Sequence, residues 1–126
     1  LGLQLMCSFS EEHDTSCLHI FDVPVVRFPR RPLVKVPHMG WNTVEIGDDP
    51  LFSGLHTPIW CYFVHSYYVP LSSETIASCA YGDIVFSAAL RSKNYRGLQF
   101  HPEKSGAAGQ QILRNFLFTS EDLLCL

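Results

Sequence analysis

The chain has 126 residues, of which 47% are hydrophobic and 17% charged, which is enough for one compact domain with a buried core. Its net charge of −3 excludes the strongly basic surface typical of nucleic-acid binding, and its longest apolar run, residues 59–69, is too short to span a membrane. Five cysteines without framework spacing indicate reduced thiols, so we expect a cytoplasmic location.

The amino-terminal part of the chain predicts a helix followed by a polar excursion. Leu1 and Leu5 fall on one helical face, so a helix is already under way at the first residue. Residues 8–17 are interpreted as an exposed loop rather than a metal site, because no second cluster supplies matching ligands. The ionisable residues of this loop are Glu11, Glu12, His13 and Asp14.

The next part alternates short apolar stretches with proline-rich turns. We expect a strand over residues 25–28, an extended stretch over residues 33–37 and a strand over residues 44–46, with a turn at residues 29–32. The intervening residues 38–42 have two interpretations. Trp41 is either buried in a core turn or presented to a partner, since Trp and Met are enriched at binding surfaces. Composition leaves both open.

The middle of the chain predicts most of the sheet. An acidic cap and Pro50 indicate a short helix over residues 48–55. Residues 59–69 are apolar on both faces, which predicts a central strand covered on both sides, and polar groups at its end could form a substrate rim. Residues 75–79 and 84–90 predict an antiparallel hairpin around Gly82.

The segment that carries chemistry is residues 95–105. Its core places His101 and Glu103 two residues apart, and Pro102 biases the preceding residue toward the extended geometry in which such a pair points to one side. A carboxylate bound to one ring nitrogen leaves the other nitrogen free to act as a base, which is two-thirds of a catalytic triad. Ser105 is a suitable N-cap for a following helix. That helix carries an apolar stripe expected to pack in the core, formed by Ala108, Ile112, Leu113, Phe116 and Leu117.

Three motifs together resemble a known enzyme family. They are Val-Pro-His-Met-Gly-Trp-Asn at residues 36–42, Phe-Val-His-Ser-Tyr-Tyr at residues 63–68 and Gly-Leu-Gln-Phe-His-Pro-Glu-Lys-Ser at residues 97–105. In this order they are similar to the class I glutamine amidotransferases. More narrowly, they resemble the glutaminase subunit of imidazole glycerol phosphate synthase in histidine biosynthesis. The resemblance runs over nearly the whole chain.

The resemblance implies an α/β, flavodoxin-like three-layer sandwich with a central mixed sheet that is incomplete at its amino-terminal side. In the family, the nucleophile lies in a Gly-x-Cys-Leu-Gly-x-Gln elbow, and residues 1–4 match the part after the cysteine. The cysteine is therefore expected immediately before Leu1. By this alignment, residues 1–126 are the carboxy-terminal larger part of a single glutamine amidotransferase domain, and this part alone is expected to be inactive.

The resemblance also implies a role for individual residues. His101 and Glu103 would complete a Cys-His-Glu triad, and the backbone N–H of Leu1 would help stabilise the oxyanion. The substrate glutamine would be held by Gln4 and by the backbone around Val64, His65, Ser66 and Tyr67. Ammonia would pass to a (β/α)₈-barrel cyclase subunit in a heterodimer, facing Met39, Trp41, Asn42 and Lys104. No metal or organic cofactor is implied.

Two alternatives from other classes stay open. One is a degenerate amidotransferase that acts as a non-catalytic binding module, which a residue other than cysteine before Leu1 would indicate. The other is a thiol hydrolase that pairs an internal cysteine with His101. Its candidates are poor, because Cys61 and Cys79 lie in apolar, strand-like stretches and Cys7 lacks an elbow context.

Overall fold

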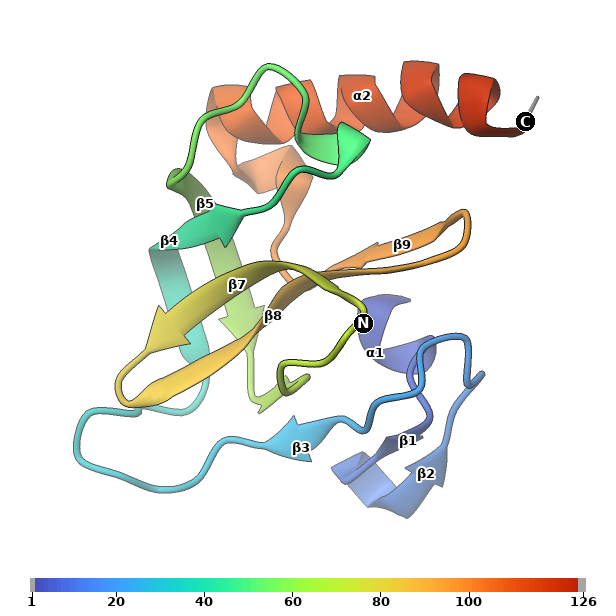
Figure 1. Ribbon diagram of the computed structural model, residues 1–126. Helices are drawn as coiled ribbons and strands as arrows, with labels where there is room; N and C mark the ends of the chain where they lie inside the picture. Colours follow the sequence, from blue (N-terminus) through green and yellow to red (C-terminus); the bar gives the residue numbers. More distant parts are fainter. Residues whose placement is uncertain (1, 125–126) are drawn as a thin grey trace.

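The structure, a computed structural model, describes the backbone of residues 2–124 and the side chains of residues 2–118 (Figure 1). The helical elements are α1 (Gly2–Leu5), η1 (Glu12–Asp14), η2 (Pro50–Phe52), η3 (Pro102–Lys104) and α2 (Gly106–Leu124), the three η elements being short 3₁₀ helices. The strands are β1 (Phe9–Ser10), β2 (Thr15–Ser16), β3 (Val26–Arg27), β4 (His38–Ile46), β5 (Ile59–His65), β6 (Tyr67–Tyr68), β7 (Thr75–Tyr81), β8 (Ile84–Ser92) and β9 (Tyr95–Leu98).

The main sheet has five strands in the order β5-β4-β7-β8-β9, and every neighbouring pair is antiparallel. The predicted hairpin is confirmed as β7 and β8, which turn at Gly82 with a φ of +61°. Two small two-stranded sheets, β1-β2 and β3-β6, lie outside the main sheet. Within the described residues, parallel pairing occurs in an isolated bridge between Ser10 and Val25. The parallel part of the predicted mixed sheet is represented in these residues by that bridge.

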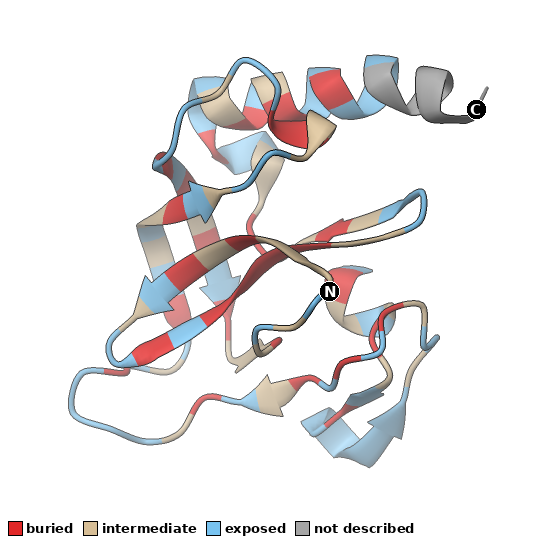
Figure 2. Ribbon diagram, in the orientation of Figure 1, coloured by how far each residue is buried: buried red, intermediate tan, exposed pale blue. Residues whose placement is uncertain are grey.

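The molecule is layered, as the α/β prediction requires. Figure 1 shows α2 on one side of the main sheet and the amino-terminal elements α1 to β3 on the other. Buried residues concentrate in the middle of β7 and β8, between these layers (Figure 2). Two apolar clusters result. One joins the sheet to η2 and α2 through Phe52 and Ile112, and the other joins Leu3 of α1 to Leu90 of β8.

Two predictions, one of a strand and one of an extended stretch, were wrong in detail. The predicted central strand at residues 59–69 is β5 at the edge of the described sheet, and its outward side chains Trp60 and Val64 are exposed because only one face packs on the core. The chain then leaves the sheet and forms β6. The stretch predicted to be extended at residues 33–37 begins inside a tight turn instead, across which Arg31 and Val34 pair before the chain enters β4.

The stripe predicted along α2 is buried only in part. Ile112 is fully buried and Ala108 packs against the core, whereas Leu113, Phe116 and Leu117 are exposed. The rotation of the helix is set by Asn115, which is buried and donates from Nδ2 to the carbonyl oxygens of Leu51 and Ser53 at 2.9 and 2.8 Å. A polar side chain that caps a loop therefore takes the core-facing position that a purely apolar pattern gives to Phe116.

A buried ion cluster ties the loop after β4 to the two strands that lead to His101. The Asp49 carboxylate, 3% exposed, accepts from Arg96 Nε and Arg91 Nη1, each at 2.9 Å, and from the backbone N–H of Leu51. Burial opposes ionisation, but the hydrogen bonds from Leu51 and the two guanidinium groups outweigh it and hold the pKa of Asp49 below its usual value. Asp49 also caps η2, as the predicted acidic cap requires.

We expect Asp49→Ala to lower the free energy of unfolding by about 3 kcal/mol, because it leaves the buried guanidinium of Arg96 without its counter-ion. The matched control is Asp48→Ala, which removes the exposed neighbouring carboxylate and is expected to change stability by less than about 0.5 kcal/mol. Urea unfolding of the two variants measures both values. Equal destabilisation would mean that the ion cluster does not hold these strands together.

Candidate active site

The predicted imidazole–carboxylate pair is present at the end of β9. His101 Nδ1 lies 2.9 Å from Glu103 Oε1, and the His101 backbone is extended, with φ −93° and ψ 100°. Glu103 sits in η3 rather than in an extended strand, so the pair closes across a single 3₁₀ turn. Because a carboxylate only accepts, Nδ1 carries the proton and Nε2 keeps its lone pair for a substrate or nucleophile.

A closed ring of hydrogen bonds fixes this corner on β5. The His101 N–H donates to the Tyr62 carbonyl at 3.0 Å, the Tyr62 N–H donates to Ser105 Oγ at 3.0 Å, and Ser105 Oγ donates to the His101 carbonyl at 2.6 Å. Ser105 precedes α2 as predicted, but its hydroxyl does not bond a first-turn N–H of that helix. The hydroxyl is used in the hydrogen bonds to Tyr62 and His101, so the predicted side-chain N-cap was wrong.

Close packing of α1 on β9 brings the start of the chain to the same place. A Cβ added at Gly97 would lie 2.5 Å from the buried Leu3 side chain and 3.4 Å from its Cα, so a larger residue here would displace Leu3. From α1, Gln4 Nε2 donates to the Tyr67 carbonyl and to Gln99 Oε1, both at 2.9 Å. Both N–H groups of the Gln4 amide are thereby used, and its orientation is set.

One cavity of about 240 Å³ collects most of the predicted site residues. It is lined by Gln4, Glu12, Val64, His65, Ser66, Tyr67, Gln99 and His101. The structure therefore brings together the general-base candidate and all five residues predicted to hold glutamine. Leu1, predicted to supply an oxyanion donor, lies outside the described residues.

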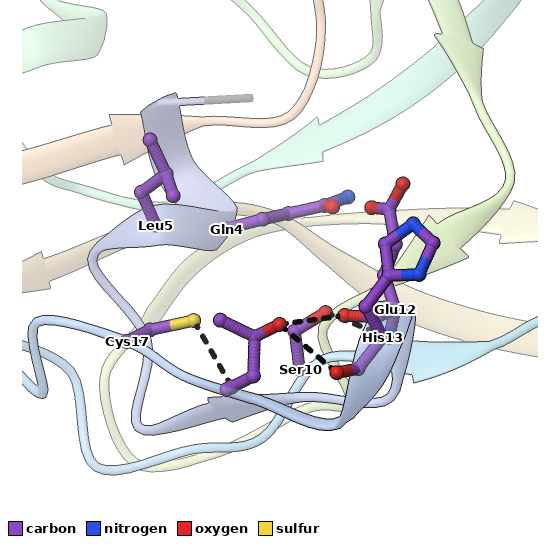
Figure 3. A pocket seen from close by; sticks show the side chains of 7 residues that line it. Gln4, Leu5, Ser10, Glu12, His13 and Cys17 are labelled. Carbon is purple, nitrogen blue, oxygen red and sulfur yellow. Dashed lines mark hydrogen bonds between the residues drawn. The ribbon is translucent and has the colours of Figure 1, made fainter.

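A second cavity of about 190 Å³ adjoins the first, since both are lined by Gln4 and Glu12. Its remaining walls come from Leu5 of α1 and from the β1-β2 excursion. Figure 3 shows the Gln4 amide pointing toward the side where Glu12 and His13 lie. The excursion is held by its own hydrogen bonds, from Thr15 Oγ1 to the Glu12 carbonyl and from the Glu12 N–H to Ser10 Oγ. The loop predicted as a solvated excursion thus forms one wall of the site.

Glu103 is suited to orient the imidazole. Its own backbone N–H, followed by the hydrogen bond and charge of His101, keeps the pKa of this carboxyl below its usual value. An ionised carboxylate at this position holds the His101 ring in one tautomer and stabilises the imidazolium that forms when Nε2 takes a proton. The corner is therefore an oriented base beside a polar cavity.

The sequence model of the family described as "Glutamine amidotransferase class-I" matches residues 1–120. The chain belongs to this family. Among solved structures, a protein assigned as part of a GMP synthase, from Thermoplasma acidophilum, superposes with a TM-score of 0.63 at 25% identity, covering 81% of this chain and 50% of that one. The fold is accordingly that of a class I glutamine amidotransferase, as the motifs predicted.

The curated relatives point to one subunit. Imidazole glycerol phosphate synthase subunit HisH of Bacteroides fragilis is 55% identical over 118 residues, which is 93% of this chain and 60% of the relative. HisH of Methanosarcina acetivorans is 50% identical over 121 residues, covering 93% of this chain and 59% of the relative. The chain thus spans about three-fifths of the length of these glutamine amidotransferase relatives.

Two residues of the amidotransferase cavity were missed by the sequence analysis, Glu12 and Gln99. Glu12 was interpreted as one charge of a solvated loop. The available signal was the concentration of acidic residues at positions 11–14. Whether their side chains point toward the cavity depends on how the β1-β2 excursion folds back. Gln99 is 7% exposed in an otherwise apolar strand segment, and a lone buried amide in such a segment was the signal for it.

The residues predicted to face a partner do not all share one surface. Met39 and Trp41, 62% and 54% exposed, point outward from β4, so the core interpretation of Trp41 was wrong. Lys104 lies near them, with Nζ 5.7 Å from the centroid of the Tyr62 ring, and Tyr62 contacts Trp41 edge to face. Asn42 is on the opposite side of the strand, because alternate residues of a strand point to opposite faces. Its amide donates inward to His38 Nε2 and to the Ala80 carbonyl.

The three cysteines considered as nucleophiles, Cys7, Cys61 and Cys79, are unsuited to nucleophilic catalysis. Burial raises the pKa of Cys7, Cys61 and Cys79 to about 12, so these thiols stay protonated at neutral pH. None of the three lines the cavity that contains His101. These positions oppose the thiol-hydrolase alternative.

Within the described part of the chain, no group of three or more His, Cys, Asp or Glu side chains is arranged to bind a metal ion. In the same part, no helix combines the length and hydropathy needed to cross a membrane.

Proposed function

We propose that the whole protein is the glutaminase subunit of an imidazole glycerol phosphate synthase, which hydrolyses glutamine to glutamate and ammonia for histidine biosynthesis. The observation that carries the proposal is the cavity lined by both His101 and Gln4, with the His101–Glu103 pair at its edge. The identity of 55% to HisH of Bacteroides fragilis supports the choice of subunit.

The proposed mechanism assigns one proton path to His101. A cysteine thiolate, expected immediately before Leu1 in the whole protein, attacks the side-chain amide carbon of glutamine. His101 takes the thiol proton at Nε2 and delivers it to the leaving ammonia, and then activates the water that hydrolyses the thioester. Glu103 orients the ring throughout. The Leu1 N–H stabilises the oxyanion, and residues 1–126 without the cysteine are inactive.

The cavity walls match the two ends of an amino-acid substrate. Glu12 places a carboxylate on the wall next to Gln4, where it would attract the α-ammonium group of glutamine. Residues 64–67 also line the cavity, and their backbone would offer polar groups to the rest of the substrate. Gln99 fixes the amide of Gln4, so the substrate meets a wall whose donors and acceptors are already oriented.

A test of the proposal compares glutamate release with glutamine binding by the whole protein, with and without the cyclase. Glutamate release that rises with the cyclase present supports the glutaminase. Glutamine binding without glutamate release would instead identify the degenerate, non-catalytic module.

We further propose that ammonia passes to a (β/α)₈-barrel cyclase subunit bound to the outward face of β4 and β5. This face carries exposed aromatic and apolar side chains next to a cation, the composition typical of interface centres. Direct contacts with the cyclase would come from Met39, Trp41 and Lys104. Asn42 would support this surface from the other side of β4, through its hydrogen bonds to His38 and Ala80.

We expect Trp41→Ala to weaken cyclase binding by at least about tenfold, because exposed Trp residues at an interface centre commonly dominate its affinity. The change in melting temperature should be small, since the indole is 54% exposed. Tyr95→Ala is the matched control, because Tyr95 is an aromatic residue of similar exposure, 49%, on β9 at the far edge of the sheet. Calorimetric titration and thermal melting separate the two effects. A large loss of stability with unchanged binding would restore a core role for Trp41.

A further inference from the structure

Two buried histidines, one in the cavity wall and one behind it, have side chains to which the proposed chemistry gives no role. His38 begins β4 and His65 ends β5, and the two residues are direct partners in the antiparallel register. They are 3% and 7% exposed. The His38 ring stacks between Phe63 and Tyr81, with centroid distances of 4.9 and 4.0 Å, so neither ring can turn without disturbing the core.

The hydrogen bonds of this pair run in one direction. His65 Nδ1 lies 2.8 Å from the Tyr67 carbonyl, which only accepts, so this nitrogen carries the proton. His65 Nε2 therefore accepts, at 2.9 Å, from the proton on His38 Nδ1. His38 Nε2 in turn accepts from Asn42 Nδ2 at 3.2 Å. All four ring nitrogens are paired, and each tautomer is determined by the next group in the chain.

This arrangement requires both rings to be neutral. An imidazolium donates from both nitrogens, so protonation of His65 would place two donors face to face between the two rings. Protonation of His38 would place two donors face to face between its Nε2 and the Asn42 amide. Burial lowers the pKa of both histidines to about 4, which keeps them neutral at physiological pH. The rings that contact the pair are those of Phe28, Phe63, Tyr81 and Phe86. Its polar neighbours are the Asn42 amide and, by charge, His101.

The chain of hydrogen bonds ends on an atom of the cavity wall. The Tyr67 carbonyl accepts from His65 on one side and from Gln4 Nε2, at 2.9 Å, on the other. Gln4 is the side chain that the motif assigns to glutamine binding, and it has no other backbone partner among the described residues. The orientation of the Tyr67 carbonyl thus fixes the orientation of Gln4.

We infer that His38 and His65 are positioning residues for the glutamine site, forming a neutral relay from Asn42 to the Tyr67 carbonyl that holds Gln4 in its binding orientation. This inference rests on the proposed glutaminase function. Asn42 lies next to Trp41 on β4, so the relay also joins the strand proposed to face the cyclase to the wall of the glutamine cavity.

Two substitutions at one position separate the two bonds of His65. In His65→Asn, the amide nitrogen occupies the place of Nδ1 and can still donate to the Tyr67 carbonyl. In His65→Gln, the amide reaches the place of Nε2 and can accept from His38, but the donor to Tyr67 is lost. The two variants remove similar ring volume, so both are destabilised by packing to a comparable extent.

The experiment measures kcat and KM for glutamine in the complete protein bound to its cyclase. We expect His65→Gln to raise KM about five- to tenfold with little change in kcat, the effect of one lost hydrogen bond in ground-state positioning. His65→Asn should keep KM within about twofold of the parent value, because the bond to Tyr67 survives. The exposed control His56→Gln should change neither constant.

The alternatives give different results. A purely structural role lowers the folded fraction, so it would reduce the apparent kcat of both variants equally and leave KM unchanged, which would overturn the inference. Nitrogen NMR of the parent protein provides a check that needs no variant, since the relay requires one protonated Nδ1 and one unprotonated Nε2 in each ring. Other tautomers would also overturn it. If the parent protein released no glutamate, the proposed function itself would fail.

Discussion

His101→Ala in the complete protein should lower glutamine hydrolysis by about a thousandfold, within the range known for loss of a general acid–base group. The reason is geometric. Glu103 occupies Nδ1, which leaves Nε2 facing the cavity as the one ring nitrogen available for proton transfer. The cyclase reaction supplied with ammonium salts should be unaffected, because it does not use this proton path. Steady-state assays of both reactions measure the two effects.

Two further variants make this result specific. Glu103→Gln should cost only about tenfold, because the carboxylate is 58% exposed and an amide oxygen or water can still hold the ring. His56→Ala removes an exposed histidine outside the cavity and should leave both reactions at parent levels. Loss of the ammonia-dependent reaction together with glutamine hydrolysis in His101→Ala would contradict the role assigned to His101.

The parts of the site that were predictable are those set by local geometry. The His101–Glu103 pair follows from a two-residue spacing around Pro102, and the structure closes it at 2.9 Å. Gln4 follows from its motif position at the start of the chain. The His101–Glu103 pair depends on backbone conformation within one turn, so a short sequence pattern specifies it, whereas Gln4 was found through the family motif.

The parts that were missed depend on packing between distant segments. Glu12 reaches the cavity because the β1-β2 excursion folds over α1, and nothing within residues 8–17 specifies that direction. The His38–His65 relay joins residues 27 positions apart through strand register. Each of these histidines taken alone is an ordinary polar residue at a strand end.

Errors in the fold have a similar origin. Residues 59–69 are apolar on both faces, and this pattern is the same whether the outward face is covered by the chain itself or by another molecule. In β5 the side chains of Trp60 and Val64 point outward and are exposed. The apolar composition of this strand therefore predicted more burial than the structure shows. On α2, Asn115 turned the helix by bonding two loop carbonyls, an interaction that hydropathy alone does not contain.

The buried histidine pair should make the protein unusually sensitive to mild acid. An unfolded histidine has a pKa near 6.5, whereas burial lowers the pKa of folded His38 and His65 to about 4. Between these values the unfolded chain binds protons that the folded protein does not, so stability is full above pH 6.5 and falls as the pH drops toward 4. The loss is on the order of 3 kcal/mol for each histidine.

Urea midpoints of the complete protein, measured from neutral pH down to about pH 4.5, test this window. Asp49 does not contribute to this window. Because its pKa is lowered in the folded protein, the stability that it provides is lost only below the ordinary aspartate pKa of 3.8.

The double variant His38→Asn, His65→Gln keeps an amide hydrogen bond between the strands but cannot titrate. It should be less stable at neutral pH and show a much flatter pH profile, whereas the exposed control His56→Gln should keep the parent slope. A parent midpoint that is constant across this range would mean that the two rings take up protons in the folded state as readily as in the unfolded chain, which is incompatible with a neutral relay.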